Sequence, residues 1–541
     1  MRSATVSLLS LHEPRPPALP IGDMPRTSRH RTAALGTLVA VLLITLHVAS
    51  FDIFHQPIVT DIRYFLYFSA RTAHGAVPHR DFFDNKTQLS TLVGALLYGA
   101  GRLAGVDPLY AIRAGYLGFA ATTGLLLFAI HRRLAGGRIV PGLIALLAYC
   151  GFALLGLLPS IGNIPKMLMA LFAAAGALAV GRRRWLLAGA AGTLAFMDWQ
   201  IGALVGLGVG CAALVDSEHP VRAILGVACG AALVAAGFVA YFAAHGALGA
   251  TYAQTIGASL ARGSSSLAQE TVPQRCVRII EELRRTCPGE LWLIALGGLG
   301  MLIYPWWLRR HFGRPTFGMA VMLAVYHYGL VLFSAIDFQL YGDIFILLHS
   351  VAFFSAVALI EAYSQLTAAA ATGAAPERRE RRLFWLRAAV LAALVALVRP
   401  AFLRPDFSLT NPIAVRGVTL EDQREVAAEF RRLALGKRLA MVYSSELLFL
   451  SGLVNQLPIV YWNTATESVY SRPGESPQDT LLRMFREVNA QVIAYPARIP
   501  LDPRVARAFT LHELKSKDGL YDAQVYVLPA AARGMNQNEQ P

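Results

Sequence analysis

The sequence predicts an all-α polytopic membrane domain followed by a small α/β domain outside the membrane. Of its 541 residues, 55% are hydrophobic and only 15% are charged, whereas roughly a quarter of the residues of a soluble protein are charged. After Pro400, long apolar runs give way to ordinary charge density and to alternating polar and apolar residues. We therefore expect a membrane domain over 33–401 and an extracytoplasmic domain over 402–541.

The basic residues read as membrane topology signals. The net charge of +15 could suggest a nucleic-acid partner, but the basic residues lie in short clusters between apolar runs, which argues against one. Arg26, Arg29 and Arg31 directly precede the first apolar run. The positive-inside rule therefore predicts that the N-terminus lies in the cytoplasm. Residues 1–32 are rich in Pro, Arg and Ser and lack apolar periodicity, so we expect them to form a disordered tail.

About 11 membrane spans satisfy the same rule at every later basic cluster. The clusters around Arg132 and Arg183 then lie inside, and the C-terminus lies outside. We expect the chain to be a multi-pass protein of the inner or plasma membrane. The predicted spans are 34–51, 109–130, 139–158, 164–181, 185–198, 199–215, 221–244, 290–307, 316–335, 339–362 and 384–401.

This topology leaves 52–108 as a large first external loop. Over 88–104 the loop has a helical pattern, because its apolar residues recur every three or four positions. A helix on the outer leaflet fits better than a span, since a span would move the next two basic clusters outside. The apolar residues of this stripe are Leu89, Leu92, Val93, Leu96 and Leu103.

In the C-terminal domain we expect helices at 419–435 and 477–488, and strands at 438–444, 490–495 and 523–528. Its sequence contains no Gly-rich phosphate loop, no Cys-pair metal motif and no Ser nucleophile elbow. We therefore expect this domain to position an acceptor or a partner and to perform no chemistry.

Ionisable residues gather at the predicted outer ends of the spans. Charged groups near hydrocarbon are costly, so such a collection is typical of a functional site. Structural alternatives remain for single members: Asp61 could cap the helix that follows it, and Lys166 could extend to the membrane interface. The set comprises Asp61, Arg63, Asp81, Asp84, Lys86, Lys166, Asp198, Asp337 and Asp343.

The string DIRYFLYFSARTAHGAVPHRDFFDNKTQLSTL at 61–92 resembles the first external loop of the GT-C superfamily of polyprenyl-phosphate-sugar-dependent glycosyltransferases. The branch it resembles contains bacterial protein O-mannosyltransferase-like and lipid A aminoarabinose transferase-like proteins. The later segment DFQLYGD is similar to another outer loop of that branch. The elements that carry the resemblance in the first loop are Asp61 with Tyr64, then Gly75, Pro78 and Asp81, and finally Phe83, Asp84, Asn85 and Lys86.

The resemblance implies an inverting GT-C-type glycosyltransferase with a polyprenyl-phosphate-linked sugar as donor. Asp61 would be the general base that activates the acceptor. Lys86, backed by Arg63 and Arg102, would contact the donor phosphate, and Asp84 would orient Lys86 or coordinate an ion. The further supporting candidates are Tyr64, Asp81, Asn85, Asp198, Asp337 and Asp343.

The other partners implied are membrane lipids and a glycan, lipid or protein acceptor. The helix at 88–104 would border the groove through which the polyprenyl chain enters. No cofactor is expected, and a divalent metal ion is not expected to be obligatory.

The loop departs from the family pattern at two positions. Ile62 follows Asp61 where the family often has a second acid, and Thr87 replaces a Pro after Lys86, which would loosen the turn. Two other function classes stay open: a lipid or solute transporter or flippase, and a non-catalytic relative that acts as a scaffold. A transporter would more often show internal repeats, and we see none in the sequence.

Two of the five cysteines, Cys276 and Cys287, fall in a polar outer loop. In an oxidising compartment they could form a disulfide. The sequence leaves the pairing open.

Overall fold

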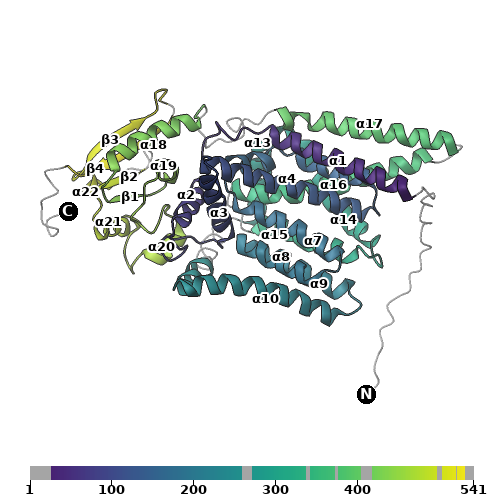
Figure 1. Ribbon diagram of the computed structural model, residues 1–541, viewed down its shortest axis with the longest axis horizontal. Helices are drawn as coiled ribbons and strands as arrows, with labels where there is room; N and C mark the ends of the chain where they lie inside the picture. The colour runs from purple at the N-terminus through teal and green to yellow at the C-terminus, as the bar shows by residue number, and fades with distance from the viewer. Residues whose placement is uncertain are drawn as a thin grey trace, which may run out of the picture.

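A long helical bundle and a smaller domain with a β-sheet lie end to end in the computed structural model (Figure 1). The structure describes residues 26–258, 271–336, 341–371, 376–403, 417–495, 502–519 and 521–529. All of its strands belong to the C-terminal domain. This architecture confirms the predicted fold class.

Each predicted span coincides with a helix of the bundle. The span predicted at 139–158 is broken into α5 and α6, which are bent by 58°, and the one at 199–215 begins with the 3-10 turn η1 (Gln200–Gly202). The helices are α1 (Arg26–Ala49), α4 (Pro108–Leu134), α5 (Ile139–Cys150), α6 (Leu154–Ile161), α7 (Pro165–Gly181), α8 (Trp185–Asp198), α9 (Ala203–Asp216), α10 (Pro220–Ala244), α14 (Leu291–Arg309), α15 (Phe317–Ile336), α16 (Tyr341–Ala371) and α17 (Pro376–Leu403).

The lengths of these helices fit a membrane protein. Within the described residues, five helices are long and apolar enough to cross a membrane, or six if the bent pair counts as one span. Shorter apolar helices, among them α7, α8 and the η1–α9 segment, accompany them. The count of 11 spans stays a prediction.

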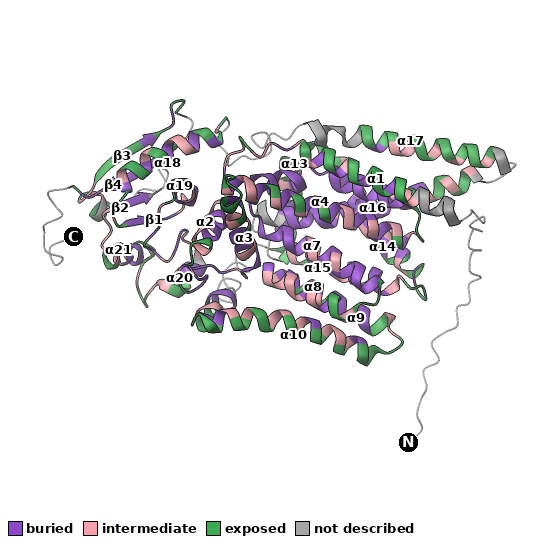
Figure 2. Cartoon of the chain, viewed as in Figure 1, coloured by how far each residue is buried: buried purple, intermediate pink, exposed green. Residues whose placement is uncertain are grey.

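Small residues let the helices of the bundle approach closely. A Cβ atom at Gly189 of α8 would collide with the backbone of Val227 on α10, and one at Gly230 of α10 would collide with the backbone of Leu186. Such small-residue contacts replace hydrophobic burial as the packing device between membrane helices. In Figure 2 the central helices α7 and α16 are mostly buried, whereas α10 and α17 expose much of their outer surface.

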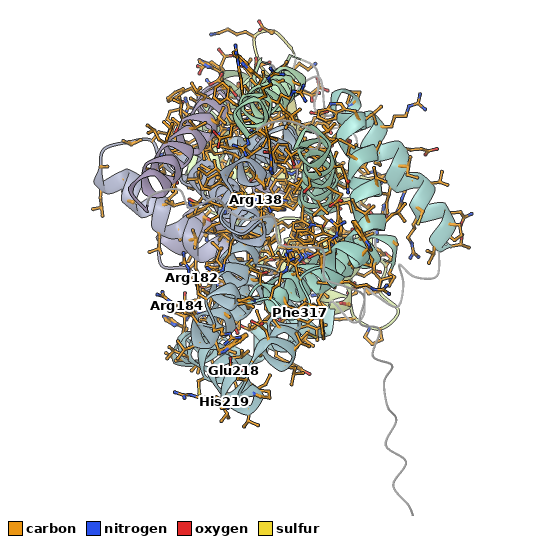
Figure 3. All side chains as sticks on the ribbon, turned by 90° about the vertical axis from the view of Figure 1, so that its right-hand side faces the viewer. Arg138, Arg182, Arg184, Glu218, His219 and Phe317 are labelled. Carbon is orange, nitrogen blue, oxygen red and sulfur yellow. The ribbon has the colours of Figure 1, made fainter. Side chains whose placement is uncertain are left out.

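The end of the bundle that lies away from the C-terminal domain carries several of the basic clusters. Figure 3 looks onto this end and labels Arg138, Arg182 and Arg184 there. The predicted topology needs such a separation, since it places these residues in the cytoplasm and the C-terminal domain outside.

Helix α2 (Ile62–Ala73) joins the two parts of the molecule. Ile62 and Leu66, four residues apart on one face, belong to the apolar core of the bundle. Tyr64 and Phe68, on the other face, belong to a core shared with the C-terminal domain. The first external loop is therefore held from both sides.

Helix α3 (Leu89–Leu103) occupies the region where the interfacial helix was expected. Ser90 and Gly94 are buried on its inner side, whereas Leu96 and Leu103 are 73% and 92% exposed. A helix with this distribution presents these two leucines away from the protein, as one at a lipid interface does. Its position relative to the membrane stays a prediction.

The C-terminal domain is built on a four-stranded sheet with the order β1-β2-β4-β3. The first pair is parallel, with Ala440 opposite Ile493, and the other two pairs are antiparallel. The predicted helices and strands are confirmed as α18 (Leu420–Ala434), β1 (Leu439–Met441), α21 (Pro477–Glu487), β2 (Val492–Tyr495) and β4 (Asp522–Val527). The sequence did not predict α19 (Ser445–Ser451), α20 (Thr464–Tyr470), α22 (Pro503–Ala506) or β3 (Thr510–Lys515).

The structure excludes the disulfide that the sequence left open. Cys276 lies within α13 (Val272–Thr286), and Cys287 caps the same helix. The helical rise places their Cα atoms roughly 16 Å apart, far beyond the span of a disulfide. Both thiols are free.

Candidate functional site

The loop around Lys86 is fastened to the turn that follows α8. The carbonyl oxygen of Asn85 accepts a hydrogen bond of 2.7 Å from Gln200 Nε2, and Thr87 Oγ1 donates one of 2.8 Å to the carbonyl of Phe196. The expectation that Thr87 loosens this turn was wrong, because the hydrogen bond from its hydroxyl fixes the turn to α8 in place of a proline. The result is that Lys86 Nζ lies 4.0 Å from the centre of the Trp199 indole.

A second lysine contacts the same indole. Lys166, in the first turn of α7, places its Nζ 4.3 Å from the centre of the Trp199 ring. The interpretation that Lys166 extends to the membrane interface was wrong, since the residue is only 6% exposed. Buried Asp198 connects the end of α8 to α7, because its Oδ2 accepts a hydrogen bond of 2.8 Å from the Met169 amide of α7.

Asp84 orients Lys86 through the backbone. One carboxylate oxygen accepts a hydrogen bond of 3.0 Å from the Lys86 amide, and the other accepts one of 3.0 Å from Gln88 Nε2. Burial raises the pKa of the Asp84 carboxyl to about 7, although both hydrogen bonds and the charge of Lys86 oppose the rise. The negative charge of Asp61 acts in the same direction as burial.

The start of this loop is held by Gln254, which the sequence did not predict. Its Oε1 accepts hydrogen bonds from the Asp84 amide at 3.1 Å and from His79 Nδ1 at 3.1 Å. Its Nε2 donates to the His79 carbonyl at 2.9 Å. Gln254 lies in the π-helical turn η2 (Ala253–Gly257) that continues α11 (Leu248–Tyr252). No sequence pattern announces a π turn, although such turns often occur at functional sites.

Asp61 stands at the N-terminus of α2 with its side chain exposed. It occupies the capping position, but its carboxylate makes no capping hydrogen bond. The structure therefore shows no capping hydrogen bond from Asp61, although its charge still lies at the helix N-terminus, where it favours the dipole. Its charge contributes to the raised pKa values of Asp84 and Tyr461, which places its carboxylate near the loop and near the C-terminal domain.

Arg63 connects the loop to the C-terminal domain. Its Nη2 donates a hydrogen bond of 2.9 Å to the Tyr64 hydroxyl, and its Nη1 lies 3.9 Å from Glu446 Oε2. Tyr521 supports Glu446 with a hydrogen bond of 2.7 Å. These contacts place Arg63 at the domain junction.

Aromatic residues of the C-terminal domain cover the same loop. The Tyr461 hydroxyl donates a hydrogen bond of 3.1 Å to Asn85 Oδ1, and its ring lies 5.0 Å from that of Tyr64. Phe83, in the same loop, contacts Tyr461 and Tyr470 edge to face. The domain therefore forms one wall of the site.

The remaining candidates lie elsewhere. Asp81 closes a turn by pairing with Arg80 at 2.8 Å and accepting the Val77 amide at 2.7 Å. Arg102 contacts His74 at the far end of α3, roughly 20 Å along the helix from the end next to Lys86.

The predicted later outer loop cannot be placed against the site. Asp337 and the side chain of Asp343 lie outside the described residues. Among those described, no group of three or more His, Cys, Asp or Glu side chains is placed to hold a metal ion.

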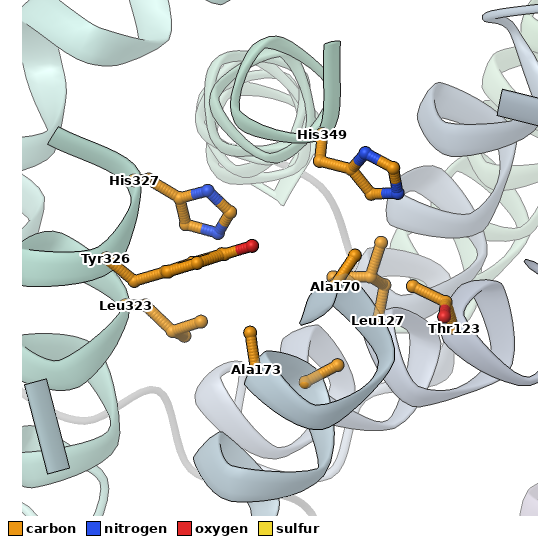
Figure 4. A pocket seen from close by; sticks show the side chains of 9 residues that line it. Thr123, Leu127, Ala170, Ala173, Leu323, Tyr326, His327 and His349 are labelled. Carbon is orange, nitrogen blue, oxygen red and sulfur yellow. The ribbon is translucent and has the colours of Figure 1, made fainter. Parts of the chain in front are cut away.

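A separate cavity of about 20 Å³, lined mostly by apolar side chains, lies between helices of the bundle. Figure 4 shows Tyr326 and His327 of α15 on one side of it, and His349 of α16 on the other. The Tyr326 hydroxyl and His349 Nε2 have no hydrogen-bond partner within the described part of the chain. A cavity of this size has room for one buried water, and these two polar atoms could bind it. Its lining shares no residue with the loop site.

The fold can now be compared with known proteins. No family model and no curated protein matches the chain. ArnT from Cupriavidus metallidurans matches in its apo state with a TM-score of 0.59 and 14% identity, over 93% of this chain and 100% of that chain. The same protein bound to undecaprenyl phosphate matches with a TM-score of 0.57 and 16% identity, over 95% and 100%.

A more distant similarity is to the archaeal oligosaccharyltransferase AglB from Archaeoglobus fulgidus, solved with an inhibitory peptide and a dolichol-phosphate. Its TM-score is 0.51 and its identity 13%, over 94% of this chain and 75% of that chain. ArnT and AglB are both GT-C superfamily glycosyltransferases. The chain therefore has a GT-C-like fold.

Proposed function

We propose that this chain is an integral-membrane glycosyltransferase that moves a sugar from a polyprenyl-phosphate donor to an acceptor at the outer face of the membrane. The observation that carries the proposal is the loop from Asp61 to Lys86. In this loop the Asp61 carboxylate makes no capping hydrogen bond, and Lys86 is held against the Trp199 ring. The GT-C-like fold supports it, since solved structures with this fold hold undecaprenyl phosphate or a dolichol-phosphate.

Asp61 acts as the general base. Its carboxylate accepts the proton of the acceptor hydroxyl while the acceptor oxygen forms a bond to the anomeric carbon of the sugar. The bond between that carbon and the phosphate oxygen breaks, and its electron pair stays on the phosphate. A single base on one side of the sugar suits direct displacement, which inverts the anomeric carbon.

Lys86 contacts the phosphate as negative charge develops on it. Electrostatic stabilisation aimed at developing charge is the largest contribution that a site of this kind can make. Asp84 fixes the backbone of Lys86, and the anchors from Gln200 and Thr87 hold the loop in place. The site can thus keep its geometry without rearrangement during the reaction.

The two sides of the loop serve the two substrates. On the bundle side, exposed Leu96 and Leu103 of α3 offer an apolar border for the polyprenyl chain. On the other side, the C-terminal domain positions the glycan, lipid or protein acceptor with the residues around Tyr461. No step in this scheme requires a cofactor.

Replacement of the base tests the proposal. In purified protein reconstituted with a lipid extract that contains polyprenyl-phosphate sugars, we expect Asp61→Asn to lower sugar transfer by about 10²–10⁴-fold. Asp52→Asn is the matched control, because Asp52 lies in the same loop and pairs with His55 and its own turn. Transfer by Asp61→Asn at the level of this control, in a protein with an unchanged melting temperature, would refute the assigned base.

The proposed site also requires that the C-terminal domain lie outside a cell membrane and the N-terminus in the cytoplasm. A reporter enzyme that is active only outside the cytoplasm, fused after residue 529, should be active. The same reporter fused before residue 26 should be inactive. The reverse pattern would place the loop on the wrong face for this function.

A further inference from the structure

The first turns of α17 are strongly basic. Residues 376–387, with the sequence PERRERRLFWLR, contain five arginines and two glutamates, a net charge of +3. The helix runs toward the C-terminal domain, so these turns lie at the opposite end of the bundle from the loop site (Figure 1). None of the five arginines forms an ion pair with another residue that the structure describes.

One face of α17 is fixed against the bundle. Leu383 and Val390, seven residues apart on this face, are only partly exposed. Leu394, further along the same face, is buried in a cluster with Ile144 of α5 and Ile360 of α16. The opposite face of the helix therefore points away from the protein.

This outward face combines cations with large aromatic rings. Arg378, Arg381 and Arg382 are all exposed on it, and Phe384 and Trp385 are each 62% exposed. A basic run that only faces water explains the arginines. It does not explain two large rings beside them, because each ring leaves its apolar area in contact with the solvent.

The order of residues along this face matches the layers of a lipid leaflet. Beyond Trp385 the exposed residues are apolar, among them Ala388, Ala389 and Ala392, as contact with hydrocarbon requires. Tryptophan itself is enriched at membrane–water interfaces. Arg381 precedes Trp385 by four residues, about 6 Å along the helix axis, and a headgroup layer is roughly 5–7 Å thick. With the Trp385 ring at the interface, the guanidinium groups lie at the height of the lipid phosphates.

We propose that this outward face of α17 binds an anionic phospholipid. The guanidinium groups donate hydrogen bonds to the headgroup phosphate, for which their fork geometry is suited, and the two rings contact the start of the acyl chains. Basic residues directly beside a membrane segment attract anionic lipids. The site does not depend on the proposed function. Its members are Arg378, Arg381, Arg382, Phe384 and Trp385.

The experiment measures which lipid lies next to Trp385. Full-length protein is reconstituted in phosphatidylcholine vesicles that contain either phosphatidylglycerol or phosphatidylcholine brominated near the headgroup, because bromine quenches a nearby indole. Each protein is measured with and without Trp385→Phe, so that the difference reports this one of the seven tryptophans. One arginine beside an anionic surface contributes about fivefold in affinity. We therefore expect phosphatidylglycerol to bind at least about tenfold more tightly than phosphatidylcholine.

Three variants test whether the charges cause this preference. Glutamine at all three arginine positions of the site should reduce the preference to about twofold or less, and lysine at the same positions should retain most of it. A control that removes three exposed arginines from the C-terminal domain should keep the wild-type preference. The site variant combines Arg378→Gln, Arg381→Gln and Arg382→Gln, and the control combines Arg432→Gln, Arg472→Gln and Arg507→Gln.

The arginines of the site are exposed, so we expect every variant to keep the wild-type melting temperature. A glutamine variant with the wild-type preference would overturn the site. An equal loss in the C-terminal control would also overturn it, since the effect would then follow net charge. Wild-type protein that shows no preference for phosphatidylglycerol at Trp385 would overturn it as well, and would leave an acidic soluble partner as the occupant of this face.

Discussion

The contact between Arg63 and Glu446 should join the first external loop to the C-terminal domain with a measurable energy. The guanidinium and the carboxylate are 3.9 Å apart, and their side chains are 30% and 6% exposed. We suggest a double-mutant cycle with Arg63→Met, Glu446→Gln and the combined variant. Glutamine keeps an oxygen that can accept the hydrogen bond from Tyr521, so the cycle isolates the charge pair.

The structure sets the expected size of this coupling. Two unit charges 3.9 Å apart interact by about 4 kcal/mol at an effective dielectric constant of 20. Water reaches the partly exposed Arg63 and screens the pair, so we expect a coupling free energy of about 1–3 kcal/mol. Each single variant should lower the free energy of unfolding, and the second substitution should then cost little more.

The assay is the free energy of unfolding in mixed detergent micelles, followed by tryptophan fluorescence. The exposed pair Glu513 and Lys515, 3.1 Å apart on β3, provides a control cycle in which we expect no measurable coupling. A coupling for Arg63 and Glu446 as small as that of the control would refute the reasoning that this pair fastens the domain over the loop.

Three further predictions concern the loop. Thr87→Val should lower kcat about fivefold, because it removes a hydrogen bond worth about 1 kcal/mol that anchors the loop to Phe196. Thr87→Ser should retain the wild-type kcat, and a Thr87→Val variant as active as wild type would show that the anchor is dispensable. Burial raises the pKa of Asp84 from 3.8 to about 7, so the folded protein holds a proton that the unfolded chain has released, and the free energy of unfolding should fall as pH rises from about 4 to 7. A pH series of unfolding should lose this component in Asp84→Asn, and an identical slope in both proteins would contradict the raised pKa. Arg102→Ala should keep sugar transfer within about twofold of wild type, because Arg102 lies roughly 20 Å from the Lys86 end of α3; a large loss would return it to the phosphate site.

The membrane bundle was predictable because long apolar runs and basic clusters are local properties of a sequence. The same holds for most of the C-terminal domain, where capped helices such as α18 and buried strands such as β2 have clear patterns. Strand β3 was missed because it is an edge strand whose sequence, TLHELK, exposes most of its residues. Without a buried face, it has no apolar alternation to detect.

The site was predictable only where one stretch of sequence contains it. Asp61, Asp84 and Lys86 lie in a single loop, and a resemblance over that loop was enough to propose their roles. Lys166 joins them only because α7 and the turn after α8 meet, through Asp198 and Met169. That contact depends on how helices pack, which no local pattern reports.

At Thr87 the sequence suggested a weakness that the structure does not have. A departure from a family pattern suggested a loose turn, but the partner that compensates for it is a backbone carbonyl 109 residues further along the chain. A sequence can show that a proline is missing, but it cannot show that a hydroxyl at the same position finds an acceptor.

The most direct test of the central claim is the lipid-linked sugar pool of cells from which this chain has been removed. The proposed function predicts that one polyprenyl-phosphate sugar accumulates, measured by mass spectrometry of the lipid extract. Expression of the wild-type chain should return the pool to normal, and expression of Asp61→Asn at the same level should not. A pool that is unchanged by removal, or that Asp61→Asn restores as well as wild type, would contradict the account.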